Sequence, residues 1–217
     1  MSRVFMSMFA FVFAAVATSM RAPAQPQAPT QPQNPSKCSL TPAQAPTIRG
    51  IKLGMSTEEI LSLFPESSQR PDIKAALVQA DGYPNYGVAR FYFRLSDYPS
   101  VAKDRFAGID GISVTLLDGR VAELRVLYAG SNSRPRGPLW LNVDDFIAKL
   151  SEAYALPSAR DWPLGSETDK MLKCNGLNIE ASAQNAGSIM LRSTDYIDIS
   201  RERAAADEEK IRREFKP

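Results

Sequence analysis

A stretch rich in proline and glutamine, residues 25–46, limits where this chain can build a folded domain. Proline lacks a backbone N–H and interrupts helices and sheets, and the polar residues beside it supply little apolar surface for a core. This stretch is therefore predicted to be a disordered tether. The residues after it, 47–217, are predicted to form one globular α+β domain, and their number suits a single core.

The residues before the tether have the pattern of a secretory signal peptide. Arg3 provides a positive start, and residues 4–17 form an apolar run. Two A-x-A cleavage motifs follow, which end at Ala17 and at Ala24. We therefore predict that residues 1–24 direct export and are removed, so that the protein is periplasmic or secreted. An uncleaved signal anchor is the alternative, although the apolar run is short for a membrane span.

The positive net charge comes entirely from the predicted signal peptide. The chain has 26 lysines and arginines against 24 acidic residues. Residues 1–24 contain Arg3 and Arg21 and no acid, so the mature chain is electrically neutral. Nucleic acids and anionic membrane surfaces are bound by basic surfaces, and we predict neither as a partner. No stable membrane span is predicted after signal cleavage.

The chain has no histidine and two cysteines. This composition excludes histidine-based catalytic triads, histidine metal sites and structural zinc sites of the Cys/His type. Glycine motifs for phosphates and dinucleotides are also missing, so no catalytic residue, metal or cofactor is predicted. An even cysteine number in an exported protein favours a disulfide, here between Cys38 and Cys174. One buried thiol and one free thiol are the alternative.

Residues 47–130 predict a capped helix followed by antiparallel strands. Ser56 and Glu59 have the spacing of a capping box, and Pro65 stops the helix that they begin. Residues 72–80 predict a second helix, with a strand as the alternative. Apolar and polar residues then alternate over residues 88–95, which is the period of a half-buried strand.

A hairpin is predicted around Asp118 and Gly119. A two-residue turn would pair Val114 with Glu123, whereas a three-residue loop would pair Val114 with Ala122. We predict the three-residue loop with a bulge, in which Gly119 is left-handed, because it gathers the apolar residues of both strands on one face.

Residues 138–217 repeat this order of elements. Asn142 is predicted to cap a helix, and strands follow at 170–176, 177–183 and 188–194, with a turn or bulge at Asn175-Gly176. A charged helix is predicted at about 200–214. The predicted fold is α+β, with helices packed on one face of an antiparallel sheet. The halves 47–130 and 138–217 are candidates for a duplication.

Arginines and a tyrosine share the polar face of the strand 88–95. They are Arg90, Tyr92 and Arg94, and Arg125 is predicted to lie on a neighbouring strand. Such residues could bind a partner, although an ordinary solvated sheet face is the alternative.

Two pairs of acidic residues are the candidate acid–base carboxylates. They are Glu58 with Glu59, and Asp144 with Asp145. Both pairs fall in the first turn of a predicted helix, where negative charge interacts favourably with the helix dipole. Helix capping explains them better than catalysis.

Residues 53–60, with the sequence LGMSTEEI, resemble the opening helix of the small outer-membrane lipoprotein A/BamE group. They are also similar to the related β-lactamase inhibitory protein fold. The resemblance implies helix pairs packed on an antiparallel sheet, sometimes in tandem, in a non-catalytic, protein-binding scaffold of the cell envelope. The lipid-bearing cysteine of the lipoprotein group is missing here, so membrane anchoring and membership of an assembly machine do not carry over.

The sequence as a whole predicts an exported, non-enzymatic protein of the cell envelope that binds another protein or an envelope component. Two alternatives stay open. One is a carboxylate hydrolase that acts on envelope polymers, which needs two acids facing each other across a cleft. The other is a structural spacer in which the tether matters most.

Overall fold

The computed structural model describes residues 38–82, 86–128, 140, 142–162, 164–184 and 187–215. The predicted signal peptide and residues 25–37 of the predicted tether lie outside these ranges. Residues 38–46, which composition assigns to the tether, lie against the domain. Cys38, Leu40 and Ala45 are partly buried on its hydrophobic core. The folded region therefore begins no later than Cys38, earlier than the boundary placed at residue 47.

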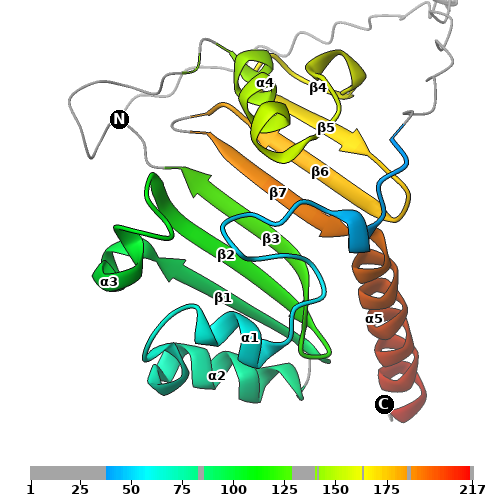
Figure 1. The fold of residues 1–217 in the computed structure, drawn as a ribbon. Coiled ribbons are helices and arrows are strands. Elements are labelled where there is room, and N and C mark those ends of the chain that lie inside the picture. Colours follow the sequence, from blue (N-terminus) through cyan, green and yellow to red (C-terminus); the bar gives the residue numbers. More distant parts are fainter. Residues whose placement is uncertain are drawn as a thin grey trace, which may run out of the picture. The chain divides into compact units, whose positions relative to one another are not determined.

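A seven-stranded antiparallel sheet forms the centre of the described fold (Figure 1). The strand order is β1-β2-β3-β7-β6-β5-β4, so the last strands of the two predicted halves, β3 and β7, pair with each other. The predicted α+β class is confirmed. The strands are β1 (Val88–Arg94), β2 (Ile109–Leu117), β3 (Arg120–Tyr128), β4 (Leu164–Gly165), β5 (Asp169–Lys173), β6 (Leu177–Ser182) and β7 (Ser188–Ser193).

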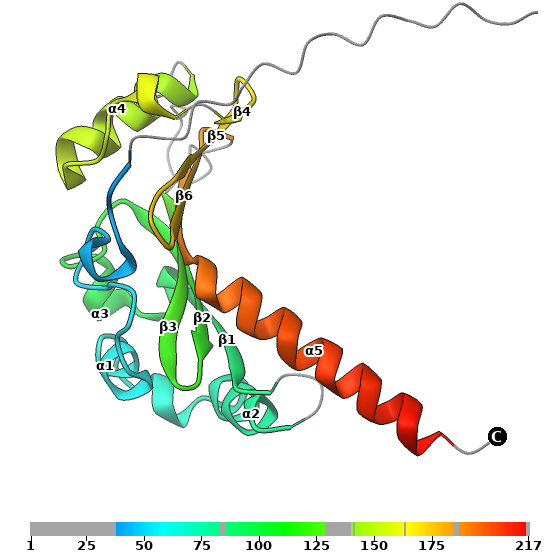
Figure 2. The same cartoon turned by 90° about the vertical axis from the view of Figure 1, so that its right-hand side faces the viewer.

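The helices fall on different sides of this sheet. In Figure 2, α1, α3 and α4 lie on one side, and α5 leaves from the other. Helix α2 packs beside the edge strand β1. The helices are α1 (Thr57–Ser62), α2 (Pro71–Ala80), α3 (Pro99–Ala102), α4 (Val143–Tyr154) and α5 (Thr194–Glu214).

The predicted helix caps are confirmed. The backbone N–H of Glu59 donates to Ser56 Oγ at 3.2 Å, and the N–H of Ser56 donates to Glu59 Oε2 at 2.7 Å. At α4, the N–H of Asp145 donates to Asn142 Oδ1 at 2.9 Å. The carboxylates of both predicted acidic pairs therefore belong to helix starts, as expected.

Helix α5 begins earlier than predicted, at Thr194 instead of about residue 200. Strand β7 has its last sheet pair at Ser193, which lies opposite Leu177, the first residue of β6. Beyond this pair the N–H of Thr194 still donates to the carbonyl of Gly176 at 3.0 Å, and the chain then continues as a helix that satisfies its own backbone groups.

The core is continuous across both halves, with aromatic rings at its two ends. In the first half, Phe64 stacks between Phe93 and Phe106, with ring centroids 3.9 Å and 5.2 Å away. At the other end, Phe146 of α4 contacts Tyr128 of β3 and Trp140, at centroid distances of 5.7 Å and 5.0 Å. These rings bury the helices on the sheet and fix its helix-covered face.

The predicted three-residue hairpin loop is wrong. Leu117 pairs with Arg120 across a two-residue turn. Both turn residues have positive φ, 50° at Asp118 and 73° at Gly119. This is the geometry that a tight hairpin requires, and Asp-Gly is among the sequences that adopt it most easily.

A bulge inside β3 restores the apolar alignment that the longer loop was expected to provide. The register shifts after the pair of Leu116 with Val121, so that Ala122 is the extra residue. Val114 then lies opposite Leu124 instead of Ala122 or Glu123. The chain thus corrects its register within the strand, because one extra residue moves every following side chain of the strand to the opposite face of the sheet.

The predicted disulfide between Cys38 and Cys174 is present, and it joins residues 136 positions apart. Cys174 precedes the predicted turn at Asn175-Gly176, and its N–H donates to the carbonyl of Leu177 at 2.8 Å. The bond therefore fixes the first described residue to the β5–β6 turn.

Replacing both cysteines, Cys38→Ser with Cys174→Ser, should lower the free energy of unfolding by about 4–5 kcal/mol, because the bond closes a long loop in the unfolded chain. Denaturant unfolding of the oxidised protein and the double variant measures this difference. A reducing agent should weaken the parent protein and leave the double variant unchanged. A difference below about 1 kcal/mol would contradict the chain-entropy argument.

Candidate functional site

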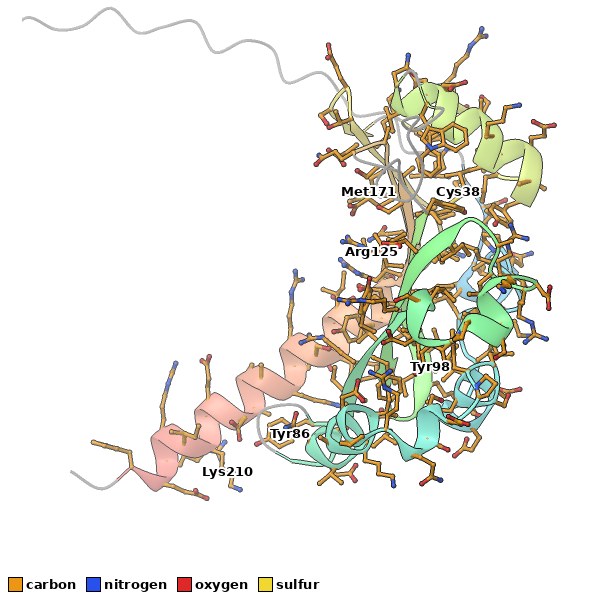
Figure 3. All side chains as sticks on the ribbon, turned by 90° about the vertical axis from the view of Figure 1, so that its left-hand side faces the viewer. Cys38, Tyr86, Tyr98, Arg125, Met171 and Lys210 are labelled. Atoms are coloured by element: carbon orange, nitrogen blue, oxygen red, sulfur yellow. A yellow bond between two sulfur atoms is a disulfide. The ribbon has the colours of Figure 1, made fainter. Side chains whose placement is uncertain are left out.

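The side of the sheet that faces away from α1 and α4 is the candidate site, and we call it the open face. Figure 3 shows Arg125 and Met171 on the side where α5 leaves, whereas Cys38 and Tyr98 lie on the other side. Strand register assigns two rows of side chains to this face. One row is Tyr92, Ser113, Arg125, Met190, Glu180 and Met171, and the other is Arg90, Thr115, Glu123, Arg192, Asn178 and Lys173.

The predicted surface residues share this face, but not in the predicted arrangement. Along β1, exposed Arg90, Tyr92 and Arg94 alternate with buried residues, as predicted. Arg125 lies on β3, and Ser113 of β2 stands between it and Tyr92. Arg125 is therefore two strands away from β1 instead of on a neighbouring strand.

Two cross-strand ion pairs form the centre of the open face. Arg125 Nη2 lies 3.8 Å from Glu180 Oε1, and Arg192 Nε binds a carboxylate oxygen of Glu123. Both guanidinium groups also donate to the sulfur of Met190, which is 3% exposed. The arginines thus cover a methionine and neutralise two acids, so their positions are fixed before any partner binds.

Sequence reasoning did not select Glu123, Glu180, Met190 or Arg192. A period-two pattern could have indicated them, because buried and partly exposed residues alternate strictly in β6. What the pattern does not contain is the pairing of β3 with β7, which brings Arg192 beside Glu123.

Tyr92 lies flat on the open face because a glycine stands beside it. Gly111 is diagonal to Tyr92 across the β1–β2 pair. A Cβ atom at Gly111 would meet the Tyr92 hydroxyl and would lie 2.8 Å from Cζ of the ring. Glycine in this strand therefore provides room for an aromatic side chain that is 45% exposed.

Helix α5 is tied to the sheet by polar contacts of Arg203. Its guanidinium makes two hydrogen bonds to Asp118, at 2.9 Å and 2.7 Å, and one to the carbonyl of Tyr86 at 2.7 Å. The Tyr86 hydroxyl donates to Asp207 at 2.7 Å. The hydrogen bonds from Arg203 hold the pKa of the Asp118 carboxyl below its ordinary value. We call this group of contacts the α5 attachment.

Beyond this attachment α5 is exposed. Two ion pairs of i,i+4 spacing form along it, Glu208 with Arg212 at 3.6 Å and Glu209 with Arg213. The large apolar side chains near its end do not pack on the domain, since Ile211 is 50% exposed and Phe215 is 73% exposed.

In the described part of the chain, cavities border the first half of α5. A cavity of about 130 Å³ lies between β1 and α5 and is lined by Arg90, Tyr196 and Arg203 among others. A larger one, of about 470 Å³, lies at the start of α5. Among the described residues, no group of His, Cys, Asp or Glu is placed to hold a metal ion. The described helices also include none that is long and apolar enough to cross a membrane.

Comparison with family models, with curated proteins and with solved structures found no match. The resemblance of residues 53–60 to the lipoprotein A/BamE group therefore stays a prediction.

Replacing Gly111 by alanine should displace the Tyr92 ring. Whether the substitution lowers or raises the free energy of unfolding should therefore depend on whether that ring is present. With Tyr92 present, G111A should destabilise the fold by roughly 1 kcal/mol through overpacking. With Tyr92→Ala also present, G111A should be neutral or stabilising, because alanine has less backbone entropy to lose than glycine. Denaturant unfolding of the four proteins measures this coupling, and equal effects in both backgrounds would contradict it.

The α5 attachment should weaken in acid. Since the folded-state pKa of Asp118 is lowered, its contribution is present above the unfolded pKa of about 3.9 and is lost as pH falls through the folded value. The unfolding free energy of the parent should exceed that of Asp118→Asn by about 0.2–1 kcal/mol at neutral pH, as for other exposed pairs. The difference should shrink in acid. A constant difference across the acid range would contradict the assignment.

Proposed function

We propose that this chain is an exported, non-enzymatic binding protein of the cell envelope and that it holds a protein partner on the open face. The observation that carries the proposal is a sheet surface that displays arginines and an exposed tyrosine on the side opposite α1 and α4. Arginine and tyrosine are enriched where binding energy concentrates in protein interfaces.

The outer part of the open face has cations that remain available to a partner. Within the described residues, no hydrogen bond or ion pair engages the guanidinium of Arg94, and Arg90 makes only a long contact of 3.4 Å to the Tyr196 hydroxyl. Tyr92 stands between these two arginines on the strand. A partner that offers carboxylates and an apolar group can therefore bind along β1.

The inner part of the open face is already ordered. Arg125 and Arg192 are held by Glu180, Glu123 and the Met190 sulfur. Side chains that are fixed before binding lose little conformational entropy on association, which favours a stable interface. The same ion pairs argue against the hydrolase alternative, because the carboxylates of Glu123 and Glu180 are both paired with arginines of the open face.

The export part of the proposal rests on the predicted signal peptide and is supported by the disulfide. Disulfides persist in oxidising compartments such as the periplasm or the exterior and are rare in the cytosol. The bond between Cys38 and Cys174 fits such a destination.

A photo-crosslinking amino acid placed at Tyr92 should capture a partner in the cells that make this protein. The matched control position is Val78 of α2, which is 75% exposed. We expect a discrete crosslinked protein from position 92, recovered outside the cytoplasm, and none from position 78. Adding Arg94→Glu should reduce the yield several-fold, because the partner's carboxylates lose a cation.

The experiment contradicts the proposal if both positions give the same crosslinks. Products confined to the cytoplasm would contradict the export part alone. An Arg212→Glu variant changes the net charge equally and lies far along α5, so its crosslinking yield should match that of the parent.

A further inference from the structure

The cavity of about 470 Å³ arises where two neighbouring strands separate. The pairing of β3 with β7 ends at Glu123 and Arg192. Beyond this pair, β3 bonds to another segment, because the N–H of Val121 donates to the carbonyl of Met55 at 2.8 Å. Strand β7 meanwhile turns into α5 at Thr194. The space between the diverging chains is the cavity.

Small residues line this space from four segments that are distant in sequence. Gly54 has a φ of 82°, which favours glycine, and a Cβ atom there would meet nothing within 4 Å. The cavity opens to solvent, because Ala43, Lys52 and Gly54 at its wall are exposed. Elsewhere in this domain phenylalanine, isoleucine and leucine fill the core. The small lining residues are Ala43, Gly54, Ala122 and Ser193.

The residues that line the cavity indicate which class of ligand it can bind. Leu53 and Val121 provide buried apolar surface. Lys52 and Arg120 also line the cavity, against a single carboxylate, that of Asp195. Asp195 lies in the first turn of α5, where the helix dipole stabilises its charge and accounts for its presence. The guanidinium of Arg120 donates to the carbonyl of Gly54 at 3.1 Å, which holds this cation at the cavity wall.

We propose that this cavity binds an apolar small molecule that carries one negatively charged group, with that group held by Lys52 and Arg120. The volume lies in the range of ordinary ligand sites, and a few polar groups on apolar walls are typical of them. This site is separate from the open face and does not depend on a protein partner binding there.

The disulfide holds one wall of the cavity in place. Pro42 and Ala43 form that wall, and they follow Cys38 closely in the chain. Pro42 also lies against Gly176 of the β5–β6 turn, next to Cys174. Breaking the bond frees this segment at one end, so binding should be weaker without the disulfide.

The test uses the oxidised chain and the fluorescent anion 1-anilinonaphthalene-8-sulfonate as the probe. We expect binding at one site, displacement by decanoate, and no displacement by decyltrimethylammonium, which has a tail of similar length and the opposite charge. Lys52→Glu and Arg120→Glu should each weaken probe binding roughly tenfold, which corresponds to about 1.4 kcal/mol. Arg212→Glu on α5 is the matched charge control and should leave binding unchanged.

A second pair of variants tests the location. Ala43→Trp should fill the cavity from an exposed wall position and abolish binding, whereas Ala205→Trp on the exposed surface of α5 should not. Cys38→Ser with Cys174→Ser should weaken binding several-fold at a temperature where near-ultraviolet circular dichroism shows the variant folded. Displacement by both amphiphiles alike, or binding that survives Ala43→Trp, would overturn the proposal.

Discussion

The pairing of β3 with β7 is the contact on which the rest of this structure depends. Each half of the chain supplies an antiparallel set of strands with a helix on one side, and this one ladder joins them into a single sheet. It aligns the apolar faces of both halves, so that one continuous core forms under α1 and α4. It also brings Arg192 beside Glu123 and Arg125 beside Met190, which creates the ordered centre of the open face. An antiparallel sheet can leave one face to solvent, and here that face is available for binding.

Local patterns predicted much of this fold, because they depend on neighbouring residues. The capping box at Ser56, the cap at Asn142 and the alternation along β1 all follow from spacing alone. The Cys38–Cys174 bond followed from the cysteine number and the expected compartment. The hairpin register was missed for a physical reason. Both a longer loop and a bulge keep the apolar residues together, and the sequence around Asp118-Gly119 satisfies either solution until the ends of β3 are paired.

The candidate site was predictable only in part, for the same reason. Arg90, Tyr92 and Arg94 belong to one strand, so their common face follows from a period of two. Arg125 was placed on the right face but one strand too close, because sheet order is a property of long-range pairing. The partners Glu180 and Glu123 lie 55 and 69 residues from the arginine that each one binds in its ion pair. No spacing rule acts over such distances, and only the β3–β7 and β6–β7 ladders bring these groups together.

The bulge at Ala122 connects the two surfaces that we propose to bind ligands. After Ala122 in the chain, the bulge restores the register that places Glu123 and Arg125 on the open face and Leu124 in the core. On the other side, β3 separates from β7 and pairs with Gly54 and Met55, which opens the cavity. Without the bulge, β3 could not combine an aligned apolar core with a tight turn at Asp118-Gly119. Because a bulge bends its strand and increases the local twist, the alignment of the core and the gap beside α5 are two effects of a single extra residue.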